Sequence, residues 1–300
     1  MRAIDLHTHT CKSDGSYTPA ELVDYAIEKG LSAVAITDHD TIEGLDEALS
    51  HAEALKEKDL PSIEVIPGIE FSTKYGEQDV HVVGLYIAYD SPVFQDALAG
   101  FVDSRTNRNR KMCENLRGAG IDITYEKLQA RYPDSVITRA HYASYLLDEG
   151  YVKSRQDAFA MYLGDHTKYF VPREKVTPEQ AVKLILHAGG IPILAHPPLY
   201  HMGNDRLDAL TARLTAEGLM GIEAFYSTYS NQDIRDMQRL AAKYDLLLSG
   251  GSDFHGANKP GLDLGSGYGK LFVPEEVLTK MKERLANINQ RMLFHKGTSK

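Results

Sequence analysis

Short apolar runs alternate with helical patterns over most of the 300-residue chain. Seven runs have the length and composition of buried strands and cover residues 2–7, 32–39, 63–72, 81–89, 191–197, 220–226 and 244–255. Helical patterns follow most of them. Repeated strand-then-helix units favour an α/β fold in which a mostly parallel sheet closes as a barrel, with an open, doubly wound sheet as the lesser alternative.

Two of the helix starts carry the same sequence signature. In TPAELVDYAIEKG, Thr18 can cap the helix, Pro19 occupies the first helical position and Glu21 completes a capping box. The segment TPEQAVKLILHAGG, which begins at Thr177, repeats this pattern and leads into the strand-like IPILAHP. Both segments therefore predict helices that connect strands.

One long segment lacks the alternation. Residues 91–169 show several helical patterns, no convincing strand and the basic run RTNRNRK. We therefore expect one barrel domain, formed by residues 1–90 and 170–300, that carries residues 91–169 as a helical insertion.

Composition and charge exclude several classes of protein. The hydrophobic fraction of 43% and the charged fraction of 25% are ordinary for soluble proteins, and no run approaches the roughly 20 apolar residues of a membrane span. No secretory leader precedes the first strand, and two cysteines, Cys11 and Cys113, are too few for a disulfide framework, so we expect free thiols and a cytoplasmic location. A net charge of -9 argues against long nucleic acids as ligands but leaves small phosphorylated ligands open.

Residue types that bind metals gather at the ends of the predicted strands. His7 and His9 in DLHTH are two residues apart, and the strand period of two directs both to the same side. The complete set of candidate ligands is His7, His9, Asp14, His39, Glu70, His81, His196, Asp253 and His255. Active sites of α/β barrels lie at the carboxyl ends of the strands, where most of these residues are expected. His81 fits less well, because it opens its apolar run.

The number of these residues favours metal binding over a structural role. A single H-x-H could be explained by buried histidines that hydrogen-bond to the backbone. Nine desolvated His, Asp and Glu side chains would be costly to bury without cations. Mixed imidazole and carboxylate ligands suit manganese, iron or zinc, and the sequence does not choose among these metals.

Five motifs carry a resemblance to a known family. DLHTHTCKSDGSYTP, ITDHD, PGIEFS, ILAHP and GSDFH, in this order over nearly the whole chain, resemble the signatures of the polymerase and histidinol phosphatase (PHP) family of metal-dependent phosphoesterases. ITRAHYASYLL in the insertion resembles the TrpH-like branch, whose members remove phosphate from nucleoside 3',5'-bisphosphates or trim short 5'-phosphorylated RNA. The resemblance implies a distorted (β/α)7 TIM-like barrel, the PHP fold, with a trinuclear metal site.

The resemblance also implies which residues share each metal. The first metal would take His7, His9, Glu70 and Asp253, the second Glu70, His81 and His196, and the third Asp14, His39 and His255. We expect two to three divalent ions. Two metals about 3.5–4 Å apart lower the pKa of a bridging water, so a metal-bridging hydroxide rather than a protein side chain is the expected nucleophile. Asp38, Asp40 or a metal-linked histidine could assist proton transfer to the leaving group.

Four residues are candidates for substrate contact. Arg139 in TRAHYA is the best phosphate clamp, because a guanidinium pairs bidentately with phosphate oxygens; the alternative is a surface arginine at a helix start. His141, Lys168 and His201 are further candidates.

The expected substrate is small. A helical insertion that covers the metal mouth would admit a mononucleotide or the end of a short RNA and exclude long nucleic acid. Two other functions stay open, namely a histidinol-phosphate phosphatase and a non-catalytic, metal-bound regulatory protein. The sequence does not give the oligomeric state.

Overall fold

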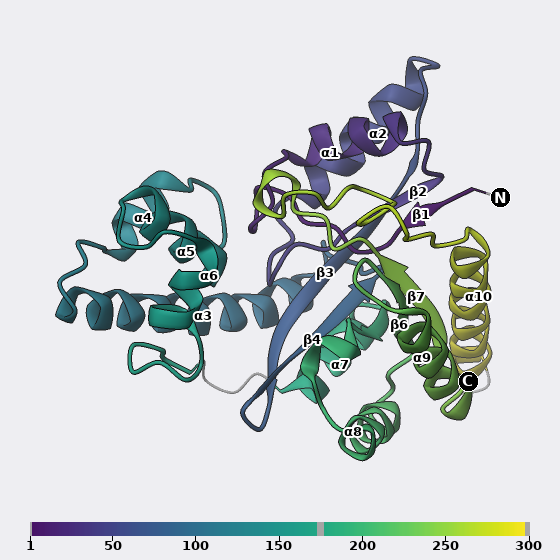
Figure 1. Cartoon of the computed structure of the whole chain (residues 1–300). Helices are drawn as coiled ribbons and strands as arrows, with labels where there is room; N and C mark the ends of the chain where they lie inside the picture. The colour runs from purple at the N-terminus through teal and green to yellow at the C-terminus, as the bar shows by residue number, and fades with distance from the viewer. Residues whose placement is uncertain (1, 173–176, 298–300) are drawn as a thin grey trace.

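Seven strands form a single sheet in which every strand pairs with its neighbours in sequence order (Figure 1). The computed structural model describes residues 2–172 and 177–297. The strands are β1 (Ile4–Asp5), β2 (Ala33–Ile36), β3 (Glu64–Tyr75), β4 (Gln78–Leu85), β5 (Ile191–Leu194), β6 (Gly221–Tyr226) and β7 (Leu247–Gly251). Hydrogen bonds from Leu6 N to Gly250 O (3.2 Å) and from Asp253 N to His7 O (2.9 Å) join the two edges of the sheet. The predicted distorted barrel is thereby confirmed.

One strand runs against the others. Neighbouring strands are parallel except that β4 is antiparallel to both β3 and β5. β3 and β4 form a hairpin in which Tyr75 is paired with Gln78, and Gly76 adopts a φ of 62° in the tight turn. No helix connects the third strand to the fourth, which departs from the strand-then-helix rhythm.

Six helices surround the barrel, and their starts follow the sequence signals. They are α1 (Pro19–Glu28), α2 (Leu45–Glu57), α7 (Pro178–His187), α8 (Asn204–Ala216), α9 (Asn231–Lys243) and α10 (Glu276–Gly297). Both predicted capping boxes are confirmed: Glu21 N donates to Thr18 Oγ1 (3.2 Å) and Thr18 N to Glu21 Oε2 (2.8 Å), and Thr177 pairs with Gln180 in the same way.

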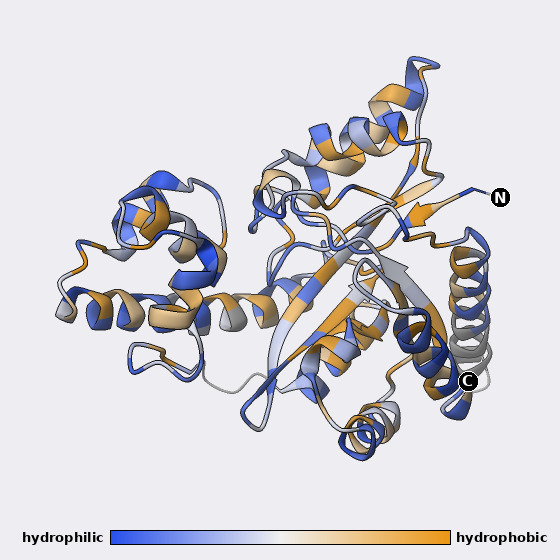
Figure 2. Ribbon diagram, viewed as in Figure 1, coloured by the Kyte–Doolittle hydropathy of each residue, from blue (hydrophilic) through white to orange (hydrophobic). Residues whose placement is uncertain are grey.

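Apolar side chains fill the barrel and the layer between strands and helices. In Figure 2, β1 and much of β4 are orange, and the helices around the barrel carry both orange and blue positions. Val273, Leu278 and Met281 belong to the same buried cluster as the strand residues Ile4 and Ile191. Helix α10 therefore closes one end of the barrel, and the opposite end is left for the polar side chains.

A helical lobe interrupts the barrel between β4 and α7. It contains α3 (Pro92–Gly118), α4 (Tyr125–Arg131), α5 (Arg139–Asp148), α6 (Arg155–Ala158) and a π-helix, η1 (Phe159–Leu163), and it is called the insertion lobe below (Figure 1). It has a hydrophobic core of its own, in which Met112, Leu128, Tyr142 and Leu146 are buried. This core is separate from the barrel core, in which Phe94 and Leu98 at the start of α3 are buried.

Two smaller expectations also concern the fold. Cys11 and Cys113 are both free thiols, as predicted, and Cys113 Sγ lies 3.3 Å from the Tyr142 hydroxyl. Among the helices in the described ranges, none has the length and apolar character needed to cross a membrane.

Candidate metal centre

The nine predicted ligands meet at the end of the barrel opposite α10. Carboxyl ends of parallel strands lie together, so the residues that follow β1, β2, β5 and β7 converge. These residues are His7, His9, His39, His196, Asp253 and His255. Glu70 lies inside β3, which is longer than β2, and forms a bridge with His39 just beyond the end of β2.

The antiparallel direction of β4 explains the position of His81. The start of an antiparallel strand lies beside the carboxyl ends of its parallel neighbours. His81 is paired with Ser72 of β3, two residues beyond Glu70, and its Nδ1 lies 2.9 Å from Glu70 Oε1. The residue that fitted the sequence pattern least well therefore faces the other ligands.

Glu70 lies at the centre of the cluster, and its side chain is 1% exposed. Five histidines approach its carboxylate. Oε2 lies 3.3 Å from His7 Nε2, 3.3 Å from His9 Nε2 and 3.0 Å from His39 Nδ1, and Oε1 lies 2.9 Å from His81 Nδ1 and 3.0 Å from His196 Nε2. One carboxylate thus connects histidines from four segments of the chain.

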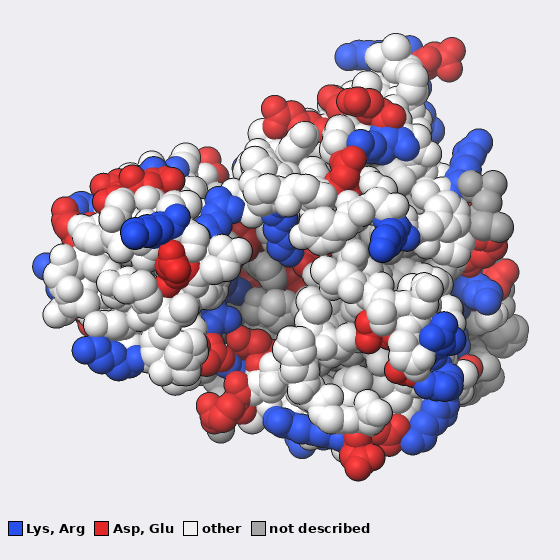
Figure 3. Space-filling model, viewed as in Figure 1, with Lys and Arg blue, Asp and Glu red and all other residues white. Residues whose placement is uncertain are grey.

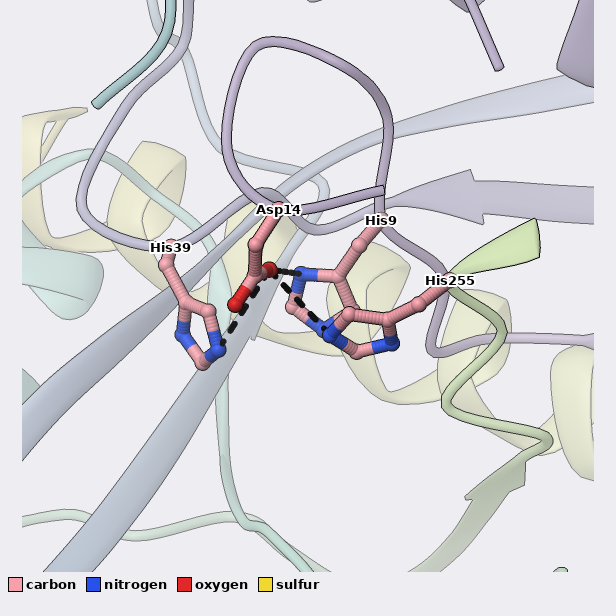
Figure 4. Close-up of side chains that lie close together, drawn as sticks. All are labelled: His9, Asp14, His39 and His255. Carbon is pink, nitrogen blue, oxygen red and sulfur yellow. Dashed lines mark ion pairs between the residues drawn. The ribbon is translucent and has the colours of Figure 1, made fainter. Parts of the chain in front are cut away.

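Asp14 forms a second focus with three histidines (Figure 4). Its Oδ1 lies 3.2 Å from His255 Nε2, 3.9 Å from His9 Nδ1 and 4.0 Å from His39 Nε2. The loop after β1 turns back on itself to place Asp14 there, with Gly15 N donating to Thr10 O (2.9 Å). A Cβ atom at Gly15 would lie 2.2 Å from the His9 carbonyl oxygen, so the turn requires glycine.

The residues fit divalent cations. Four groups of ligand atoms each lie within 4.8 Å of one another: His9, Asp14, His39 and His255; His7, Glu70 and His196; His7, His9 and Asp253; and His39, Glu70 and His81. Within the described residues, four buried atoms of these side chains have no hydrogen-bond partner, namely His7 Nε2, His9 Nε2, Asp14 Oδ1 and His196 Nδ1. Buried polar atoms are rarely left without partners, so metal coordination is the natural role of these atoms.

Close contacts between imidazoles and carboxylates shift the pKa values in the cluster. Burial alone would raise the pKa of Glu70 and of Asp14, but neighbouring histidines hold both well below their ordinary values. Burial opposes the charge of His9, yet Asp253 and Glu70 raise its pKa to about 9, whereas burial lowers the pKa of His39 to about 3. Because metal ligands must be deprotonated, cations and protons compete for these nitrogens.

Three supporting residues were not predicted from the sequence. Glu223 is 1% exposed; its Oε1 lies 2.8 Å from His7 Nδ1, and its Oε2 accepts the His196 backbone N–H at 2.7 Å. Tyr226 and Lys259 both donate to Asp253 Oδ2 at 2.5 Å. Glu223 is the single charged residue of the run LMGIEAFY, and a lone carboxylate inside an apolar strand was the available signal.

We expect Glu223→Gln to weaken metal binding about 10- to 100-fold, because a carboxylate behind a ligating histidine orients the ring and raises its basicity. Metal titration of the purified variant, followed by elemental analysis, measures the change. Glu179→Gln is the matched control, since Glu179 is also a buried glutamate but pairs with Arg213 on the outer helices. Equal affinities for wild type and Glu223→Gln would contradict the prediction.

A cavity lies between the metal cluster and the insertion lobe and is called the interlobe cavity below. Its lining consists of Asp14, His39, Ser72, Thr73, Lys74, Asp79, His81, Arg105, Arg108, Thr138, Arg139, Ala140, Phe159 and Phe170. Figure 3 shows the surface hollowed between the lobe and the barrel, with acidic and basic side chains around the hollow. Arg139 donates to Asp79 Oδ2 (2.7 Å) and Asp165 Oδ1 (2.5 Å) at the edge of this cavity.

The other three predicted substrate contacts lie elsewhere. His141 is buried, and its Nδ1 accepts the Thr138 backbone N–H (3.0 Å), which completes the cap of α5; burial lowers its pKa to about 4. Lys168 is exposed, with Nζ 5.0 Å from the centre of the Tyr169 ring, and His201 is exposed after a 3₁₀ turn. None of the three lines the interlobe cavity, so the structure brings only Arg139 to it.

Comparisons with known proteins agree with this geometry. The PHP domain family matches residues 5–163. The 3',5'-nucleoside bisphosphate phosphatase of Chromobacterium violaceum is 35% identical over 267 residues, which cover 88% of this chain and 91% of that protein. The 5'-3' exoribonuclease Rnm of Escherichia coli is 33% identical over 291 residues, which cover 96% of this chain and 97% of that protein.

Two solved structures share the fold over most of the chain. A Chromobacterium violaceum protein described as an amidohydrolase with bound sulfate superposes with a TM-score of 0.79 at 35% identity, covering 88% of this chain and 90% of that one. A Bifidobacterium adolescentis protein described as a metal-dependent phosphoesterase has a TM-score of 0.79 at 30% identity, covering 93% and 95%. This chain therefore belongs to the PHP family and is a metal-dependent phosphoesterase.

Proposed function

We propose that this protein hydrolyses nucleoside 3',5'-bisphosphates or 5'-phosphorylated oligoribonucleotides of a few residues at a trinuclear metal centre. One observation carries the proposal: the interlobe cavity joins ligands of the metal cluster, such as His39 and His81, to the cationic side chains of Lys74 and Arg139. A phosphate ester in this cavity would meet both. The names of the Chromobacterium and Escherichia relatives support nucleotides and RNA as the substrate class.

The three ion sites would divide the nine ligands among them, and two of the sites would share Glu70. We assign His7, His9, Glu70 and Asp253 to one ion, Glu70, His81 and His196 to another, and Asp14, His39 and His255 to the third. His9 also lies near the third group. Bound divalent ions supply a Lewis acid and a water of lowered pKa, so no protein nucleophile is needed.

Residues of the chain itself would position the substrate and shield it from water. Val136 N donates to Lys12 O (2.9 Å) and Thr138 Oγ1 donates to Asp14 Oδ2 (3.0 Å), so the insertion lobe is tied to the metal-binding loop. Burial raises the pKa of the Cys11 thiol, which leaves it largely neutral and argues against cysteine as a nucleophile. In this proposal, the lobe covers the open side of the metal centre.

The expected substrate preference tests the proposal. The cavity encloses about 200 Å³, too little for a folded duplex, so adenosine 3',5'-bisphosphate or a short 5'-phosphorylated RNA should be hydrolysed far better than duplex DNA or histidinol phosphate. A competition assay with manganese at matched substrate concentrations gives kcat/KM for each. Equal turnover of histidinol phosphate would favour the alternative phosphatase activity, and efficient digestion of duplex would show that the lobe is not a cover.

Arg139→Ala should keep its metals but lose turnover of nucleotides. Losing a charge-assisted phosphate contact costs about 2–4 kcal/mol of transition-state stabilisation, or roughly 30- to 1,000-fold in kcat/KM. Steady-state kinetics combined with elemental analysis measures both quantities. Arg131→Ala is the control, because Arg131 also pairs with two carboxylates, Asp148 and Glu149, but lies outside the cavity. Wild-type kcat/KM in Arg139→Ala would leave Arg139 as a structural ion-pair residue.

A further inference from the structure

We propose that Phe159 is the stacking surface for the nucleobase of the substrate, so that the interlobe cavity selects nucleotides over other phosphate esters. The inference rests on the proposed function and names the part of the site that recognises the base. The cavity lining is polar or charged except at Ala140, Phe159 and Phe170. Two aromatic rings in an otherwise ionic cavity offer a surface that phosphate and ribose do not use.

Phe159 is placed at the rim rather than in the core. It is the first residue of the π-helix η1, and its side chain is 37% exposed. A π-helical turn is rare and occurs often at functional sites. Leu163 of the same turn is buried in the lobe core. Phe159, in contrast, is not part of that core. A partner that covers the ring would remove apolar surface from water.

Phe170 has a different role, because cations already lie over its ring. The Arg139 guanidinium carbon and Lys74 Nζ each lie 5.4 Å from the ring centre. Both cations are thus held beside the aromatic part of the cavity, with Arg139 Nη1 also 3.5 Å from the Leu163 carbonyl oxygen of η1. Arg139 therefore contacts the π-helix that carries Phe159.

The cavity lining contains the groups that a nucleotide needs. The metal-ligand candidates His39 and His81 and the cation Lys74 come from the barrel, and Arg139 and Phe159 come from the lobe. Because the enclosed space is about 200 Å³, a substrate with its phosphate near the barrel must extend its remaining part toward the rim. The aromatic base of a nucleotide would then reach Phe159.

Stacking on one phenylalanine predicts a preference for bases without strong choice among them. Every base has a π face, so base stacking tolerates sequence, and losing one stacked base costs about 1–3 kcal/mol, which corresponds to about a 5- to 150-fold change in kcat/KM. The four nucleoside 3',5'-bisphosphates should therefore be hydrolysed at similar rates, and an abasic analogue much more slowly.

The test compares Phe159→Ala with wild type on two substrates, adenosine 3',5'-bisphosphate and its base-free analogue, 1-deoxyribose 3,5-bisphosphate. We expect kcat/KM for the nucleotide to fall about 5- to 150-fold, mainly through KM, and kcat/KM for the analogue to stay unchanged. Phe159→Tyr should retain wild-type behaviour. Met161→Ala is the matched control, because Met161 lies on the same π-helix, is 53% exposed and does not line the cavity.

Binding measured by calorimetry, with the same two ligands and the same variants, makes the result independent of turnover. Tighter binding of the nucleotide than of the analogue, lost in Phe159→Ala, supports stacking. An equal loss of affinity for both ligands, or no loss for either, would overturn the inference. Phe159 would then have a structural role in the lobe or no role in the site. If the wild type binds the nucleotide through its base but does not hydrolyse it, the proposed function fails while the base site stands.

Discussion

Glu70→Ala is expected to reduce phosphoester hydrolysis at least about 1,000-fold, equivalent to about 4 kcal/mol of transition-state stabilisation, and to lower the metal content. The carboxylate lies within 3.3 Å of nitrogens from five histidines, so its removal affects every ion site to which we assign it. Activity assays with manganese and elemental analysis of the same preparation measure the two effects together.

Glu53→Ala is the control for this variant, since Glu53 is an exposed glutamate of α2 that pairs with Lys56. Circular dichroism of both variants checks that the barrel is folded. A folded Glu70→Ala protein that retains full metal content and wild-type kcat/KM would show that Glu70 is not a shared ligand.

Arg105→Ala is expected to destabilise the protein by about 3–5 kcal/mol, because the substitution removes the cationic member of a buried ion pair with Asp40. Arg105 Nε donates to Asp40 Oδ2 (2.9 Å) and Nη2 to Ser72 Oγ (2.9 Å), with Asp40 fully buried and Arg105 5% exposed. Helix α3 of the lobe is thereby joined to the barrel beside the metal cluster. Urea unfolding gives the change in free energy.

The same helix supplies a matched control. Arg110 pairs with Glu126, and the two side chains are 50% and 65% exposed, so Arg110→Ala should cost no more than about 1 kcal/mol. Similar losses in both variants would mean that the Arg105–Asp40 pair contributes no more than a surface pair. The double variant Arg105→Ala with Asp40→Asn should recover part of the loss, because it also removes the buried negative charge that Arg105 neutralises.

The barrel could be predicted from local patterns, but the hairpin could not. Caps at Thr18 and Thr177 and the apolar runs identify strands and helices directly. Residues 73–80 are mostly polar and did not resemble strands, yet residues 73–75 end β3 and residues 78–80 begin β4. The two strands satisfy each other's backbone groups there, so this part of the hairpin needs few apolar side chains.

The convergence of the nine candidate ligands could also be predicted, because strand ends determine where they lie. Substrate contacts were harder to predict from the sequence. Arg139 and His141 are two residues apart in the sequence, and residues at this spacing on a helix do not face the same side, so Arg139 lines the cavity while His141 caps α5. The Arg105–Asp40 pair joins residues 65 positions apart, and no local pattern connects them.

The contact between the β1 segment and β7, which closes the barrel, affects how the protein folds during synthesis. β1 has only two residues, and the partners of the β1 segment on its open side come far later in the chain. Gly250 O, which accepts from Leu6 N, is 244 residues later, and Val273 O, which accepts from Ile4 N, is 269 residues later. His7 and His9 therefore cannot meet Asp253 until nearly the whole chain has left the ribosome. Contacts between such distant segments form slowly, so the nascent protein has an unpaired strand edge and no catalytic centre until the last strand docks.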